Sequence, residues 1–228
     1  MIMRLSNMRV REGFTLAEVL ITLGIIGVVA AMTMPTLMNS TQGAQYKAAF
    51  KKSLSALSQA VTLNVALDDY NFADIDNSTY KLEKMFKERM NVVRTETAAT
   101  NIKDSGGQLY SARTADGDGI GSAQTIGTSN VTLFFNDGIM FTFNPTEAKE
   151  CSYDETIGGS AAKRCKGLID VNGTKAPNRI IKCDEGDGST PDSKDCKVNS
   201  ATDVYPVYFY DQTVLPATAA GKAVLYGK

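Results

Sequence analysis

The pattern of hydrophobic and polar positions divides the chain into one strongly apolar segment near the N-terminus and a mixed remainder. Residues 14–34 contain a single charged side chain, Glu18, and no other stretch of the sequence is as apolar. As an α-helix rising about 1.5 Å per residue, this run spans about 31 Å, close to the hydrocarbon core of a bilayer. The basic residues Arg4, Arg9 and Arg11 precede it and favour a cytoplasmic location for that end.

Three interpretations of this N-terminus compete. A secretory signal peptide also starts with basic residues, and Ala30 and Ala31 supply small side chains for a cleavage site. Its apolar region, however, usually has only about 7–15 residues. A plain membrane anchor leaves Glu18 unexplained, because an ionisable side chain within a membrane segment is costly and is usually functional. The third interpretation depends on the residues immediately around Glu18.

The sequence GFTLAE at residues 13–18 resembles the N-terminal signal of type IV pilins and type II secretion pseudopilins. The resemblance covers about the first quarter of the chain. It implies that a prepilin peptidase cuts after Gly13 and that Phe14 becomes the N-methylated first residue. It also implies that Glu18 pairs with the terminal amine of a neighbouring subunit and that Pro35 kinks the helix. The simpler alternatives are a carboxylate at the membrane interface for Glu18 and the end of the anchor for Pro35.

The helical pattern continues beyond the proline. From Gln45 to Leu67, apolar side chains recur at steps of four, three, four and four residues, which places them on one helix face: Phe50, Leu54, Leu57, Val61 and Val65. We therefore expect one helix from Phe14 to about Leu67. The expected divisions are a leader (1–13), a transmembrane and assembly helix (14–35), its amphipathic continuation (36–70) and an extracytoplasmic head (71–228).

The head has the pattern of an α+β domain. Residues 79–90 predict a short amphipathic helix, and residues 131–143 predict a hairpin around Asn136-Asp137-Gly138, a favoured turn sequence. Further strands are expected at residues 167–171, 179–183, 204–210 and 223–226. Pro206 in the third of these predicts an edge strand or a bulge, because proline lacks the N–H of the ladder. The expected fold is pilin-like, with a long N-terminal helix packed on an antiparallel sheet.

Four cysteines lie in the C-terminal half of the chain: Cys151, Cys165, Cys183 and Cys196. A head outside the cytoplasmic membrane favours disulfides, which would tie down the loops of the head. Three pairings are possible and the sequence does not choose among them. Sequential pairing would close two loops of similar size. Zinc binding is disfavoured, since the chain has no histidine and no closely spaced cysteine pair.

Two acidic segments raise the question of calcium. Asp116 and Asp118 alternate with glycines as at the start of a calcium loop, but the later bidentate glutamate is missing. A second acidic stretch lies between Cys183 and Asp203. We expect the aspartates and glycines of both segments to form turns on a solvated surface, and we expect no cofactor. Calcium binding is the alternative.

Composition narrows the function classes. The formal net charge is −1, so the chain as a whole has no electrostatic preference for nucleic acid, and no nucleic-acid partner is expected. Histidine is absent, which excludes histidine-based acid–base and nucleophile systems and disfavours an enzyme.

The resemblance implies a structural subunit of a type IV pilus-like or type II secretion pseudopilus filament. Its partners would be the prepilin peptidase, other pilin or pseudopilin subunits, and the membrane. It would be a single-pass protein of the bacterial cytoplasmic membrane, with an extracytoplasmic head, until it assembles into a filament. The alternative is a membrane-anchored binding or adhesion module, such as a minor pilin whose head binds a ligand or DNA.

Overall fold

The computed structural model describes residues 13–97, 102, 130–153, 163–189 and 194–227. The chain divides into two compact units, residues 1–39 and 40–228. One helix, α1 (Leu16–Asp68), contributes to both units. The predicted long helix is thus confirmed, and its path runs through Pro35 without ending there.

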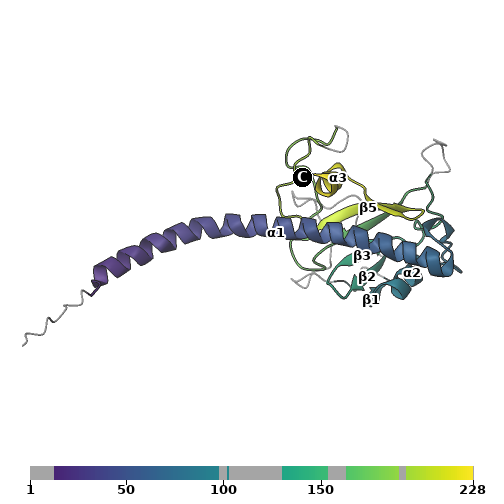
Figure 1. Ribbon diagram of the computed structural model, residues 1–228, viewed down its shortest axis with the longest axis horizontal. Helices are drawn as coiled ribbons and strands as arrows, with labels where there is room; N and C mark the ends of the chain where they lie inside the picture. The colour runs from purple at the N-terminus through teal and green to yellow at the C-terminus, as the bar shows by residue number, and fades with distance from the viewer. Residues whose placement is uncertain (1–12, 98–101, 103–129, 154–162, 190–193, 228) are drawn as a thin grey trace, which may run out of the picture. The chain divides into compact units, whose positions relative to one another are not determined.

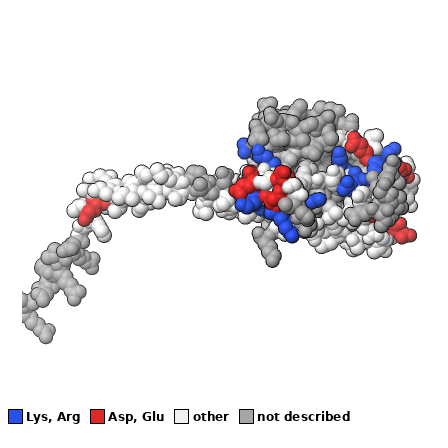
Figure 2. Space-filling model, turned by 90° about the horizontal axis from the view of Figure 1, so that it is seen from above, with Lys and Arg blue, Asp and Glu red and all other residues white. Residues whose placement is uncertain are grey.

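In the first unit, the described residues form the N-terminal part of α1. The stretch Leu16–Met34 is long and apolar enough to cross a membrane by length and composition, and none of it is buried within the chain. Its apolar side chains are exposed on every side of the helix, including Leu16, Leu20 and Ile26. Figure 2 shows this stretch without charged surface, apart from one acidic area near its start.

The second unit is built on one antiparallel sheet whose spatial order follows the chain, β1-β2-β3-β4-β5-β6. The strands are β1 (Val92–Glu96), β2 (Val131–Phe135), β3 (Met140–Phe143), β4 (Cys165–Asp170), β5 (Val204–Tyr210) and β6 (Thr213–Pro216). The described residues of this unit also form three short helices: η1 (Phe72–Asp74), α2 (Leu82–Arg89) and α3 (Ala219–Tyr226). An antiparallel sheet with helices on it is the predicted α+β class, and the long N-terminal helix makes it pilin-like.

The C-terminal half of α1 covers one face of this sheet (Figure 1). Its predicted apolar positions Phe50, Leu54, Leu57 and Val61 are buried in the main core. The ring of Phe50 stacks on that of Tyr205 in β5, with centroids 4.0 Å apart. The apolar face that the periodicity predicted is therefore the face that the helix packs against the sheet. A smaller cluster, which includes Met140, Leu168 and Val204, fills the other face of the sheet.

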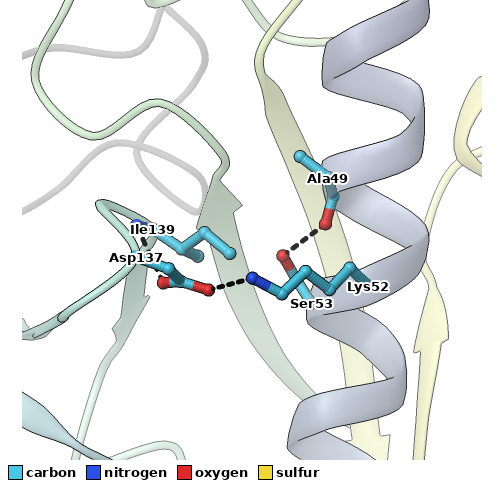
Figure 3. A network of polar contacts seen from close by, with 5 residues as sticks. All are labelled: Ala49, Lys52, Ser53, Asp137 and Ile139. Atoms are coloured by element: carbon cyan, nitrogen blue, oxygen red, sulfur yellow. Dashed lines mark hydrogen bonds and ion pairs between the residues drawn. The ribbon is translucent and has the colours of Figure 1, made fainter.

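The β2–β3 turn is fastened to the same helix (Figure 3). Lys52 Nζ lies 2.9 Å from Asp137 Oδ2, and Ser53 Oγ donates a 2.7 Å hydrogen bond to the carbonyl of Ala49 on the preceding turn. Gly138 follows with φ of 87°, a conformation that favours glycine. The predicted hairpin is confirmed, and its aspartate also orients the turn toward the helix.

The C-terminal segment corrects one prediction. Residues 223–226 belong to α3, not to a strand. The hydroxyl of Thr218 accepts a hydrogen bond from the backbone N–H of Gly221, which caps the first turn of that helix. A four-residue apolar run is compatible with either structure, so the cap decides.

Two other strand predictions also differ from the structure, and two strands were not predicted. Residues 179–183 were predicted as a strand but form only an isolated bridge, from Ile180 to Val204. The strands β1 and β6 were not predicted. Pro206 lies in an interior strand, because β5 pairs with both β4 and β6. Its carbonyl accepts a hydrogen bond from Ala217 N, so its missing N–H faces the β6 side, just beyond the end of that strand. The proline therefore removes no bond of the β4–β5 ladder.

The cysteines pair sequentially as Cys151–Cys165 and Cys183–Cys196. The pairs are separated by 14 and 13 residues along the chain. In the chain-entropy account, a bridge that closes a loop of this size lowers the entropy of the unfolded chain. Each bridge then stabilises the folded state by about 3 kcal/mol. The first bridge closes the segment between β3 and β4, and the second lies in the long connection from β4 to β5. The expectation of disulfide-tied loops is confirmed.

Candidate functional site

Three of the predicted processing and assembly residues lie at or just before the first turn of α1. Gly13 and Phe14 precede the helix and are exposed, and Phe14 is 90% exposed. Among the described residues, apart from Gly13 itself and its chain neighbour, no atom lies within 4 Å of the position that a Cβ on Gly13 would occupy. The peptide bond between these two residues is therefore in open, non-helical chain, the arrangement that a protease needs to reach it.

Glu18 closes a capping box with Thr15, which the sequence analysis did not single out. The Glu18 carboxylate accepts hydrogen bonds from the Thr15 backbone N–H, at 2.9 Å, and from its hydroxyl, at 2.8 Å. The Thr15 hydroxyl in turn accepts the Glu18 backbone N–H, at 3.3 Å. A threonine followed three residues later by glutamate, before an apolar run, is the sequence signal that would have identified Thr15.

Between Glu18 and Pro35, α1 has no polar face. Ile21, Ile25 and Val29 are all more than half exposed, although their side chains are apolar. A helix that is apolar all round needs a surrounding of lipid or of other apolar helices. Pro35 lies about five turns further along α1, too far to belong to the same cluster as Gly13, Phe14 and Glu18.

The acidic segments divide into one that the structure describes and one that it does not. Asp116 and Asp118, the calcium candidates, lie outside the described residues. In the second segment, Asp184 accepts backbone N–H groups from Asn199 and Ser200, and Asp195 accepts that of Gly188. No group of three or more potential metal ligands of the Asp, Glu, Cys or His type occurs within the described ranges. Asp184 and Asp195 thus act as acceptors for backbone N–H groups of turns.

A buried carboxylate lies where the β4–β5 connection meets α1. Asp203 accepts the backbone N–H groups of Asn178, at 2.9 Å, and Arg179, at 2.7 Å. Burial outweighs these hydrogen bonds and raises the pKa of Asp203 to about 6. Burial also raises the pKa of Tyr46 on α1 and that of Tyr205 on β5. The hydroxyl of Tyr46 accepts a 3.1 Å hydrogen bond from Asn172 Nδ2, which ties this cluster to the helix.

The N-terminal segment is similar to a known sequence family. Residues 8–34 match the family model of the prokaryotic N-terminal methylation motif. The chain carries this motif. The match includes Gly13, Phe14 and Glu18, so the resemblance drawn from GFTLAE is confirmed on the residues that carried it.

A relative extends the similarity beyond the methylation motif. The chain is 28% identical over 102 residues to the type II secretion system core protein G of Vibrio cholerae serotype O1. The match covers 45% of this chain and 63% of the relative. No solved structure matches the chain. The similarity to this relative is thus longer than the motif, while more than half of the chain lies outside the match.

Proposed function

We propose that this chain is a structural subunit of a type IV pilus-like or type II secretion pseudopilus filament. The observation that carries the proposal is the N-terminal methylation motif at the start of a helix whose apolar stretch Leu16–Met34 is not buried within the chain. Such a helix requires a lipid or helical surrounding, and a filament of like subunits supplies the second. The pseudopilin relative supports the same class.

The precursor is a single-pass protein of the bacterial cytoplasmic membrane. The basic leader stays on the cytoplasmic side, and the disulfide-containing head is extracytoplasmic. The prepilin peptidase cuts between Gly13 and Phe14, where the open chain before α1 supports access. Phe14 then carries the new terminal amine, which is methylated. The chain itself is the substrate of these reactions and not an enzyme.

Glu18 provides the polar contact of assembly. Its carboxylate lies one helical turn from the new amine and is exposed, so it is available to the terminal amine of a neighbouring subunit. Pairing the two charges offsets the cost of placing either of them alone in an apolar bundle. The apolar surface of residues 14–34 supplies the non-directional part of the contact.

Mass spectrometry of the chain purified from its native membrane tests the proposal. The expected product begins at Phe14, carries one added methyl group and lacks residues 1–13. A Gly13→Val variant is expected to remain uncut, because a β-branched side chain then crowds the bond. Gly24→Val is the matched control, since the position of a Cβ at Gly24 is equally open but lies within the helix. An intact Met1, or a start near Met32 in the wild type, would exclude a pilin-like subunit.

A further inference from the structure

A tyrosine-lined pocket lies in the head, on the sheet face turned away from α1. Its volume is about 150 Å³, and it is bounded by the ends of β4, β5 and β6 and by α3. Alternate residues of a strand point to opposite faces, so Tyr208 and Tyr210 lie on this side while Tyr205, Val207 and Phe209 face the main core. Tyr210, at the end of the strand, also packs against the edge of that core. The pocket is lined by Tyr153, Arg164, Tyr208, Tyr210, Leu215, Pro216, Ala217, Lys222 and Tyr226. We refer to these residues as the tyrosine pocket.

Arg164 is held between two aromatic rings of this pocket. Its guanidinium carbon lies 4.6 Å from the ring centroid of Tyr153 and 4.9 Å from that of Tyr208. Stacking fixes the plane of the guanidinium and leaves its edge, which carries the N–H donors, free to bind an acceptor. Tyr153 also contacts Tyr210, with centroids 5.2 Å apart. The cation is therefore positioned before any ligand arrives.

The described charges of the tyrosine pocket are positive. Arg164 and Lys222 line it, and no aspartate or glutamate is among the lining residues that the structure describes. Within the described part of the chain, neither cation forms an ion pair with a carboxylate. Asp211 lies nearby, but its carboxylate accepts the backbone N–H of Tyr153 at 3.3 Å. Two cations that line one hollow favour an anion, and the planar guanidinium fits a carboxylate with two parallel hydrogen bonds.

The volume and the lining side chains of the tyrosine pocket restrict the class of ligand further. Pockets for drug-sized ligands have about 300–1,000 Å³, so this smaller one accommodates a single ring. Four of its side chains are tyrosines, which combine an apolar ring face with a hydroxyl at the edge. A pyranose ring packs its C–H face on such a ring and bonds its hydroxyl groups to the phenol oxygens. We propose that the tyrosine pocket binds a hexuronate, a hydroxylated sugar ring that bears one carboxylate.

The test uses the full chain in detergent micelles and D-glucuronate as the probe, with isothermal titration calorimetry or ligand-observed NMR as the measurement. A dissociation constant of about a millimolar is expected for one such ring. D-glucose, which lacks the carboxylate, and benzoate, which lacks the hydroxylated ring, are each expected to bind at least about tenfold more weakly. Arg164→Gln and Lys222→Gln are each expected to weaken glucuronate binding by about the same factor.

Lys166→Gln is the matched control. Lys166 pairs with Tyr208 across the strands and is exposed, yet it does not line the pocket. The same change of charge there is expected to leave the affinity within about twofold, and thermal unfolding confirms that each variant is folded. The proposal is overturned if no glucuronate binding is detected at a concentration 20-fold above the expected dissociation constant. It is also overturned if Lys166→Gln and Arg164→Gln weaken glucuronate binding equally. Tighter binding of benzoate than of glucuronate would overturn the assignment to a sugar.

Discussion

The carboxylate of Glu18 accepts the backbone N–H of Thr15, so this glutamate caps the helix on which it lies. The single subunit therefore already has a use for the side chain that we propose to pair with a neighbour's amine. The two roles are compatible because a carboxylate offers about four lone-pair positions, and Thr15 occupies one oxygen, Oε2, of the two. They are also separable, because capping needs an acceptor whereas pairing with an amine needs a negative charge.

Substitutions at Glu18 separate these roles. Glutamine also closes a capping box, so Glu18→Gln is expected to preserve the first turn of α1 and membrane insertion but to lower filament yield severely. Glu18→Ala removes both roles and is expected to lower the yield at least as far. The measurement is the amount of sheared or crosslinked filament relative to membrane-inserted subunit. Thr15→Val provides the comparison, because it removes the threonine cap and retains the charge. Wild-type filament yield from Glu18→Gln would contradict the charge pairing.

The second half of α1 belongs to the core of the head, and one residue tests this. Phe50 is fully buried and stacks on Tyr205, so Phe50→Ala is expected to lower the free energy of unfolding by about 3–5 kcal/mol. Leu63 is on the same helix but is 51% exposed, and Leu63→Ala is expected to change it by no more than about 0.5 kcal/mol. Denaturant unfolding of the oxidised full chain in detergent, followed by near-UV circular dichroism of the tyrosines, gives both values. Equal effects of the two substitutions would show that the helix does not pack as described.

The parts of the fold that were predictable from the sequence are those with long or chemically specific signals. The apolar run of residues 14–34 and the regular spacing from Phe50 to Val65 cover many helical turns, so chance agreement is small. Asn136-Asp137-Gly138 specifies a hairpin turn through glycine's tolerance of positive φ. The same reasoning selected Gly13, Phe14 and Glu18, whose identity and spacing form one motif and which lie within the matched methylation motif.

The missed elements have weak local signals. Residues 223–226 are too few to distinguish a strand from a helix, and the Thr218 cap that decides lies outside the apolar run. The strand β1 is partly exposed and polar, and Arg94 and Glu96 form an ion pair along it, so its side chains do not alternate as in a half-buried strand. The tyrosine pocket was unpredictable for another reason. It combines segments around Tyr153, Arg164 and Tyr226 that only the sheet register brings together.

The pH dependence of stability follows from Asp203. In the unfolded chain this carboxyl ionises near its ordinary pKa of 3.8, and in the folded chain burial raises the pKa to about 6. Between these values the folded state holds a proton that the unfolded state has released. The free energy of unfolding contributed by this group therefore falls as the pH rises from about 4 to 6, and is constant above that range. A shift of this size corresponds to about 3 kcal/mol. Tyr46 and Tyr205 stay protonated throughout, because burial raises the pKa of both.

Asp203→Asn is expected to remove this fall. The amide is neutral at every pH, so the wild type loses about 3 kcal/mol relative to the variant between pH 4 and pH 7. Asp184→Asn is the control of opposite sign. At Asp184, burial is outweighed by hydrogen bonds from Ser200 and Asn199, which hold its pKa below the ordinary value. The stabilisation that Asp184 provides is thus lost as the pH falls below about 4. Asp184→Asn is expected to remove this loss on the acid side and to leave the fall in stability between pH 4 and 6 unchanged. Parallel pH profiles for the wild type and Asp203→Asn would show that Asp203 is ionised in the folded chain at pH 5.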